Sequence, residues 1–122
     1  MSLYLARHTL LELHGCNPAL LRDSAALEPI VAEAVRKAGG TIVAQMFHDF
    51  SPHGATGVIV IAESHVAIHT WPENAFAAAD IFSCSATLDH AMIEAQLAAA
   101  LEAQNVTSRT FDRGLERSAA DG

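Results

Sequence analysis

Three polar residues, Glu63, Ser64 and His65, interrupt an apolar run that extends from Val58 to Ile68. The residues on either side of them favour a strand, and a sheet buries such residues. Carboxylate, hydroxyl and imidazole groups in an apolar run cost free energy unless they are paired or take part in chemistry. The interruption is therefore the first candidate site in the chain.

Seven histidines raise the possibility of a metal site, and His65 with His69 has the spacing of a helical zinc pair. The residues between them favour a strand, in which four residues span roughly 13 Å. That separation is too large for one ion, which each nitrogen holds at about 2 Å. The remaining histidines have no ligand spacing and are predicted to be surface or hydrogen-bonded residues: His8, His14, His48, His53 and His90. The sequence predicts no metal site.

By spacing alone, neither Ser64 nor the two cysteines are indicated as nucleophiles. Ser64 lacks the GxSxG elbow of a serine hydrolase. Cys16 and Cys84 lie far apart with no CxxC pair, so the sequence indicates neither a disulfide framework nor a thiolate metal site. By its spacing alone, Cys84 is expected to be a small buried side chain.

The elements that must position these residues follow from periodicity and turn signals. Strands are expected at 3–14, 41–50, 56–63, 65–71, 77–84 and 106–112, with helices at 18–37 and 88–104. The predicted order is β-α-β-β-β-α-β. This pattern indicates an α+β, two-layer fold, a mainly antiparallel sheet with two helices on one face. The second face of such a sheet needs cover, so we expect the chain to associate.

The bulk composition sets the class of protein. A chain of 122 residues predicts one domain over 1–122, and 51% apolar with 17% charged residues is typical of a globular protein. The net charge of −7 argues against nucleic-acid binding. No apolar run reaches the roughly 18–20 residues of a membrane span, and the N-terminus lacks the apolar region of a signal peptide. A cytosolic protein with a flexible tail at about 114–122 is expected.

The stretch "AESHVAIHTWPE", followed by a strand that ends in cysteine, "AAADIFSC", resembles a known family. The chain is similar to the bacterial and archaeal S-adenosylmethionine decarboxylase proenzymes, which process themselves and use a pyruvoyl group. The resemblance extends from about Arg7 to Arg113 and includes "ARH" and "FHDFSPHGATGV".

The resemblance implies a reaction at the interruption. The Ser64 hydroxyl would attack the carbonyl of Glu63, the amide would become an ester, and elimination would leave a covalent pyruvoyl group derived from Ser64. The products would be a β-chain of 1–63 and an α-chain of 64–122. Decarboxylation of an α-amino acid leaves a carbanion, and the pyruvoyl carbonyl provides an electron sink for it.

Roles for single residues also follow from the resemblance. His69 is expected to remove the α-proton of Ser64 during processing, for which an imidazole is suited. Thr56 supports processing, and Cys84 returns a proton to the substrate carbon after carbon dioxide leaves. Substrate binding is assigned to Glu73, which holds the ribose hydroxyls, to Phe50, which stacks on adenine, and to Trp71.

Several alternatives remain open at this stage. Asn74-Ala75-Phe76 and Ser85 depart from the pattern of the family, in which glycine is common at both places. An arginine or ornithine decarboxylase on the same scaffold is therefore an alternative, as is a non-processing regulatory homologue. The resemblance further implies a homodimer with shared active sites. An extended segment predicts the same, because it would hold Ser64 and His69 about 16 Å apart on opposite faces unless it bends.

Overall fold

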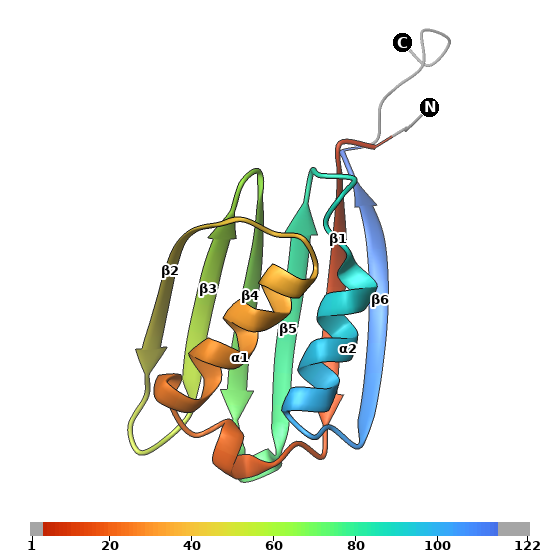
Figure 1. Cartoon of the computed structure of the whole chain (residues 1–122). Coiled ribbons are helices and arrows are strands. Elements are labelled where there is room, and N and C mark those ends of the chain that lie inside the picture. Colours follow the sequence, from red (N-terminus) through yellow and green to blue (C-terminus); the bar gives the residue numbers. More distant parts are fainter. Residues whose placement is uncertain (1–3, 115–122) are drawn as a thin grey trace, which may run out of the picture.

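The computed structural model describes residues 4–114, so almost all of the tail predicted at about 114–122 lies outside the described residues. Eight helices and strands organise this part of the chain (Figure 1). They are β1 (Ala6–His14), α1 (Ser24–Lys37), β2 (Ile42–Asp49), β3 (Ala55–Ile61), β4 (Ser64–Trp71), β5 (Phe76–Ser83), α2 (His90–Ala100) and β6 (Asn105–Arg113). Short 3₁₀ turns at Pro18–Leu20 and Pro72–Asn74 complete the path.

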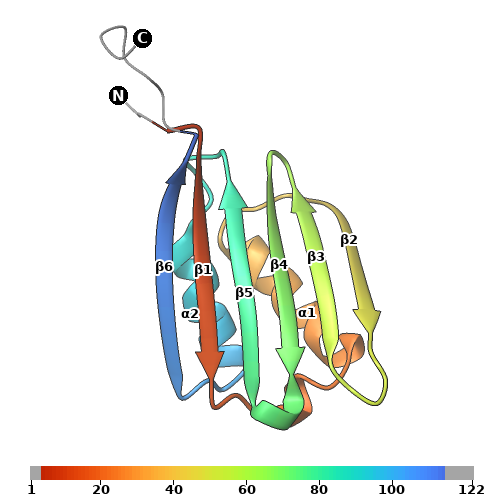
Figure 2. The same ribbon diagram turned by 180° about the vertical axis from the view of Figure 1, so that it is seen from behind.

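The six strands form one sheet in the order β2-β3-β4-β5-β1-β6, and every neighbouring pair is antiparallel. Both helices lie on one face of the sheet, and the view from behind shows the other face without helices (Figure 2). The predicted two-layer α+β fold is confirmed. Neither helix within residues 4–114 is long and apolar enough to cross a membrane.

The order β-α-β-β-β-α-β counts one strand too few, because four strands lie between the two helices, one at each of the four ranges expected there. The apolar run around the polar interruption forms a hairpin, with one strand at each of the ranges expected at 56–63 and 65–71. Strand β3 ends at Ile61, and β4 begins at its pairing partner Ser64. Only Ala62 and Glu63 therefore form the turn. The interruption at Glu63 and Ser64 is therefore the place where the chain reverses.

The helix expected at 18–37 begins only at Ser24. Asp23 is its N-cap, and its carboxylate accepts a hydrogen bond from the Ala26 amide at 3.0 Å. Pro29 lies inside the helix. The second helix is also shorter than predicted, because Asp89 caps it in the same way through the Met92 amide.

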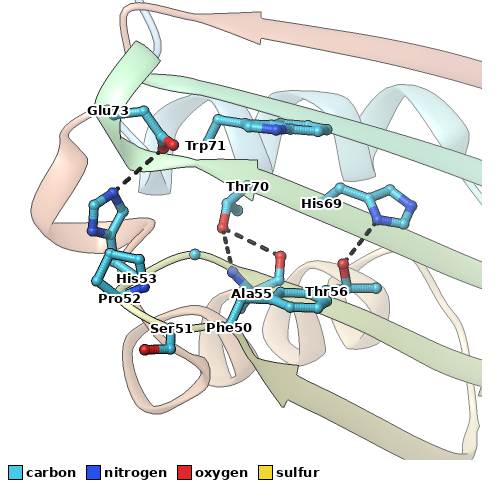
Figure 3. A pocket seen from close by; sticks show the side chains of 11 residues that line it. Phe50, Ser51, Pro52, His53, Ala55, Thr56, His69, Thr70, Trp71 and Glu73 are labelled. Atoms are coloured by element: carbon cyan, nitrogen blue, oxygen red, sulfur yellow. Dashed lines mark hydrogen bonds and ion pairs between the residues drawn. The ribbon is translucent and has the colours of Figure 1, made fainter.

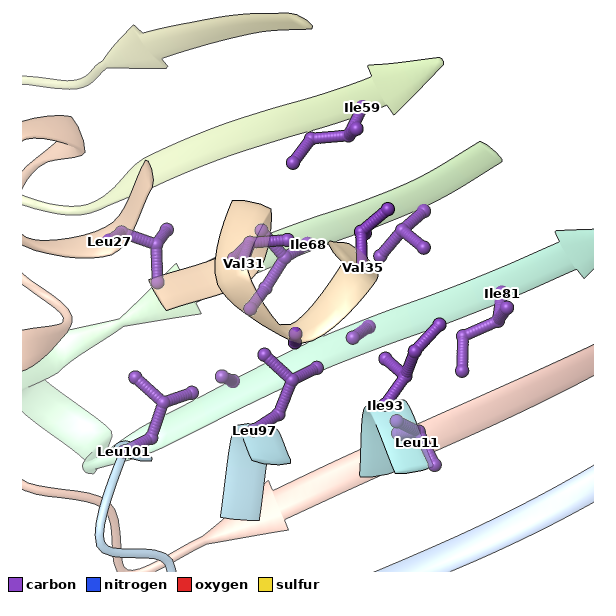
Figure 4. Close-up of a cluster of buried hydrophobic side chains, with 14 of the residues drawn as sticks. Leu11, Leu27, Val31, Val35, Ile59, Ile68, Ile81, Ile93, Leu97 and Leu101 are labelled. Carbon is purple, nitrogen blue, oxygen red and sulfur yellow. The ribbon is translucent and has the colours of Figure 1, made fainter. Parts of the chain in front are cut away.

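The hydrophobic core fills the space between the helices and one sheet face (Figure 4). Each helix contributes fully buried residues that recur every four positions, which keeps them on one side of a 3.6-residue helix. They are Leu27, Val31 and Val35 of α1, Ile93 and Leu97 of α2, and Leu101 at the C-cap of α2. Alternate strand residues such as Leu11, Ile59, Ile68 and Ile81 meet them.

The opposite face of the sheet, which we call the open face, is partly apolar and carries no covering element within residues 4–114. Its exposed large apolar side chains are Leu10, Met46, Val58, Val60, Trp71 and Phe111. Such a face is typical of a surface that associates with another layer.

Candidate active site

A hollow of about 510 Å³ opens where the loop 50–54, which joins β2 to β3, meets the start of β3, the end of β4 and the 3₁₀ turn at Pro72–Asn74 (Figure 3). This size is usual for a site that binds a small molecule. Five residues assigned from the sequence lie together in its wall: Phe50, Thr56, His69, Trp71 and Glu73. We call this hollow the ring pocket, because aromatic rings and imidazoles form much of its lining.

Thr56 and His69 come together because they are direct partners in the antiparallel pairing of β3 and β4. Partners in an antiparallel pair project on the same face of the sheet and touch. The Thr56 hydroxyl and His69 Nδ1 lie 3.0 Å apart and form a hydrogen bond. The contact fixes the orientation of the imidazole on the open face.

Thr70 secures the base of the ring pocket from the buried side of β4. Its hydroxyl accepts a hydrogen bond from the Ala55 amide at 2.9 Å and donates to the Leu21 carbonyl at 2.8 Å. The Gly54 amide donates to the Arg22 carbonyl at 2.8 Å, with φ of +100° at Gly54. These bonds hold the loop that carries Phe50 against the segment before α1.

Glu73 enters the ring pocket from the 3₁₀ turn and meets His53, one of the histidines predicted to be surface or hydrogen-bonded residues. His53 Nε2 lies 3.6 Å from Glu73 Oε1, and Figure 3 shows the two side chains facing each other. Both are partly exposed, so the pair orients the carboxylate rather than neutralising it in a buried site. No ligand spacing in the sequence indicated His53, because its partner lies in another loop.

The departure at Asn74-Ala75-Phe76 has a local structural meaning. Ala75 adopts the left-handed conformation, with φ of +50°, where glycine is the usual residue. The chain therefore keeps a turn shape suited to glycine, although a residue with a Cβ there costs roughly 1 kcal/mol. The turn that carries Glu73 is closed by this left-handed alanine.

The Glu63–Ser64 junction occupies the other end of β4. Glu63 has φ of +61°, an unfavourable left-handed conformation for a residue with a side chain. Ser64 is 8% exposed, and its Oγ is the one buried side-chain oxygen or nitrogen without a hydrogen-bond partner in residues 4–114. A strained peptide thus adjoins an unpaired hydroxyl, although native proteins usually pair buried polar groups.

Cys84 lies beside this junction. Its amide donates a hydrogen bond to the Glu63 carbonyl at 3.3 Å, and its side chain is exposed. The prediction from spacing that Cys84 is a small buried residue was wrong, because β5 ends at Ser83 and the thiol lies beyond the packed face. The other thiol, Cys16, is buried, and burial raises its pKa.

The assigned residues therefore fall into two groups, which we call the junction (Glu63, Ser64 and Cys84) and the ring pocket. Ser64 lies on the buried face of β4, whereas His69 is exposed on the open face. The pairing of β4 with both neighbours has no register shift between them, so the segment does not bend. Five strand residues separate their Cα atoms by about 16 Å.

The histidines of the described chain are not gathered into a metal site. Within residues 4–114 no group of three or more His, Cys, Asp or Glu side chains is placed to hold an ion. His65 and His69 lie on one strand, as their neighbours predicted.

Comparison with known proteins identifies the class. The family model of S-adenosylmethionine decarboxylase matches residues 7–114. The S-adenosylmethionine decarboxylase proenzyme of Parasynechococcus marenigrum is 42% identical over 118 residues, which cover 94% of this chain and 90% of that protein. The proenzyme of Thermodesulfovibrio yellowstonii is 50% identical over 84 residues, 69% of this chain and 62% of that protein.

A solved structure agrees with the sequence matches. The adenosylmethionine decarboxylase from Aquifex aeolicus superposes with a TM-score of 0.85 at 27% identity, covering 96% of this chain and 97% of that one. Fold and matches together define a carboxy-lyase. Within that class, the chain belongs to the S-adenosylmethionine decarboxylase family, as the motif around Ser64 predicted.

Proposed function

We propose that this S-adenosylmethionine decarboxylase is made as a proenzyme that splits itself between Glu63 and Ser64, and that Ser64 becomes a covalent pyruvoyl group. The observation that carries the proposal is the junction itself. A buried hydroxyl without a partner adjoins a peptide whose first residue has a positive φ. Ester formation would relieve the strain at Glu63 and give the Ser64 oxygen a bonded partner.

The chain around the junction suits a group formed from Ser64. The two fragments, 1–63 and 64–122, would remain joined by the hydrogen bonds of β3 with β4 and of β1 with β5. The new N-terminus would lie at the end of a strand, beside the exposed Cys84 thiol. The pyruvoyl group supplies a carbonyl that withdraws electrons from the substrate carbon. Cys84 would then return the proton to that carbon.

The ring pocket suits S-adenosylmethionine better than a short amino acid. Phe50 is 52% exposed and Trp71 is 42% exposed, so their rings are open to a nucleoside and a sulfonium. Glu73 offers two carboxylate oxygens for the ribose hydroxyls. Arginine or ornithine needs neither feature. The product is the aminopropyl donor of polyamine synthesis, and the cytoplasmic location stays a prediction from the sequence.

We further propose that two chains share each active site. One extended strand separates Ser64 from His69, and the two side chains face opposite sides of the sheet. In a two-fold dimer that buries the open face, the junction end of one sheet can meet the ring-pocket end of the other, where splitting would free the new N-terminus to turn toward the open face. The apolar side chains of the open face support such packing. His69, Thr56, Glu73 and Phe50 would then serve the partner's Ser64.

Substrate choice tests the proposed function. Carbon dioxide release from S-adenosylmethionine, arginine and ornithine at equal concentration should show the highest kcat/KM for S-adenosylmethionine. Glu73→Gln should lower that value by roughly 10- to 100-fold, mainly through KM, because a charged acceptor of the ribose hydroxyls is lost. Splitting at Ser64 should continue in this variant.

Glu33→Gln, on the exposed side of α1, is the matched control and should leave all three rates unchanged. A preference for arginine would instead assign the Asn74-Ala75-Phe76 and Ser85 departures to a changed specificity. A chain that splits but releases carbon dioxide from none of the three would contradict the proposed substrate class. A non-processing regulatory homologue is disfavoured because Glu63, Ser64 and His69 are all present.

A further inference from the structure

A buried histidine outside the assigned residues lies on the junction side of the molecule. His90 is the first residue of α2 and is 9% exposed. Its Nε2 lies 2.8 Å from Ser83 Oγ, and its Nδ1 lies 2.8 Å from Thr9 Oγ1. The Thr9 hydroxyl also contacts Thr110 Oγ1 at 3.0 Å. This chain of polar groups crosses the core from β6 to β5.

The chain of polar groups ends next to Ser64. Ser83 is the direct partner of Ser64 in the antiparallel pairing of β4 and β5, and both side chains are buried on the helix side of the sheet. Partners of this kind have Cβ atoms about 4.5–5.5 Å apart, so rotation of one serine side chain brings the hydroxyls within hydrogen-bond reach. Ser64 Oγ has no hydrogen-bond partner in the structure.

We propose that Ser83 and His90 together accept the proton of Ser64 Oγ when that oxygen attacks the Glu63 carbonyl. The inference rests on the proposed self-splitting and assigns its first step to residues of the helix side. His69 cannot take this role within its own chain, because it lies on the other face of β4. We assign His90 as a positioning residue and proton acceptor that acts through Ser83.

The step balances in protons and bonds. Ser64 Oγ gives its proton to Ser83 Oγ as Ser83 gives its own proton to His90 Nε2. Ser64 Oγ bonds to the Glu63 carbonyl carbon, and the carbon–nitrogen bond then breaks. His90 Nε2 then returns a proton to Ser83 Oγ as Ser83 gives its own proton to the leaving nitrogen of Ser64. An ester and a free amine result, and His90 ends neutral as it began.

The surroundings of His90 keep it ready to accept a proton. Burial lowers the pKa of His90 below its ordinary value of 6.5, and the Arg7 charge on β1 lowers it further. Asp89 on α2 opposes this shift, whereas His8 on β1 adds to it. The neutral imidazole is therefore the form present at neutral pH. The proposed step uses its tautomer with the proton on Nδ1, which donates to Thr9 and leaves Nε2 to accept from Ser83.

The test separates ester formation from the later elimination. In a His69→Ala background the ester should accumulate, because the base for elimination is missing. Hydroxylamine cleaves esters but not amides, so brief treatment of freshly synthesised chain should release 1–63 and a 64–122 fragment that begins with serine. Denaturing mass spectrometry measures both. Ser83→Ala or His90→Gln added to this background should slow ester formation by about 100-fold or more.

Two further measurements separate proton transfer from support of the fold. The side chain introduced by His90→Gln can still form a hydrogen bond with Ser83 but cannot take up a proton. Ester formation should slow as the pH of a preincubation falls below the pKa of His90, whereas the His90→Gln chain should show no such dependence. Hydroxylamine is then applied at one fixed pH. Thr107→Val, at an exposed position of β6 outside the chain of polar groups, should form the ester at the unaltered rate.

The outcomes distinguish this inference from the proposed function. If the His90→Gln and Ser83→Ala chains form the ester as fast as the His69→Ala background alone, the role of these two residues is overturned and the pyruvoyl proposal is left intact. A pH profile that is the same with and without His90 would also overturn it. A wild-type chain that never splits would overturn the proposed function instead.

Discussion

Co-expression of Ser64→Ala with His69→Ala should restore decarboxylase activity to about a quarter of the wild-type level, although each variant alone is inactive. If chains mix at random, about half of the dimers are mixed. A mixed dimer has one centre that lacks both residues and one centre that is intact. The expectation follows from the separation of Ser64 and His69 on opposite faces of an unbent β4.

The matched control combines Ser64→Ala with Cys84→Ala. Both residues belong to the junction, so every centre of the mixed dimer is damaged and activity should stay absent. Two different affinity tags allow the mixed dimer to be purified before carbon dioxide release is measured. Purified mixed dimers of Ser64→Ala and His69→Ala that are inactive would place both residues in one centre of one chain.

Replacement of Cys84 by alanine should leave splitting at Ser64 at least slowly active but reduce kcat by about 100-fold or more. The thiol is exposed at the end of β5, where its backbone amide contacts the Glu63 carbonyl. We propose that it protonates the substrate carbon, a step that would follow formation of the pyruvoyl group. Intact mass reports splitting, and carbon dioxide release reports turnover.

Cys16→Ala provides the control, because it removes the only other thiol of the chain. Cys16 is buried in the core, so its loss should lower the unfolding temperature and leave kcat unchanged. Full decarboxylase activity in split Cys84→Ala would remove the thiol from the mechanism. Loss of splitting together with turnover would instead give Cys84 a role in processing.

The face on which each residue of β4 lies could be predicted from the sequence. Alternation from Val66 to Trp71 indicates a strand, and an odd separation of Ser64 and His69 puts them on opposite faces. The hairpin turn was harder to locate, since Ala62 and Glu63 are not typical turn residues. The turn takes a strained conformation at Glu63, which local preference does not predict.

The start of α1 could not be predicted for a different reason. Asn17 and Asp23 are both good cap residues, and Pro18 suits a first turn. Tertiary contacts favour the later start, because Thr70 Oγ1 binds the Leu21 carbonyl and the Gly54 amide binds the Arg22 carbonyl. These contacts join positions far apart in the sequence.

The candidate site also depends on contacts between positions that are far apart in the sequence. The resemblance identified the residues of the junction and the ring pocket, and the structure brings Phe50, Thr56, His69, Trp71 and Glu73 together. Sequence reasoning missed His53 and His90. Their contacts to Glu73, Ser83 and Thr9 depend on loop and helix packing rather than on spacing.

The intact mass of the purified wild-type chain tests the central claim most directly. We expect two species under denaturing conditions, residues 1–63 and residues 64–122, formed without added protease. The second should be lighter than a fragment beginning with serine by the mass of one ammonia molecule, because the pyruvoyl group has lost the Ser64 nitrogen. A single uncut species after long incubation of folded protein would contradict the account.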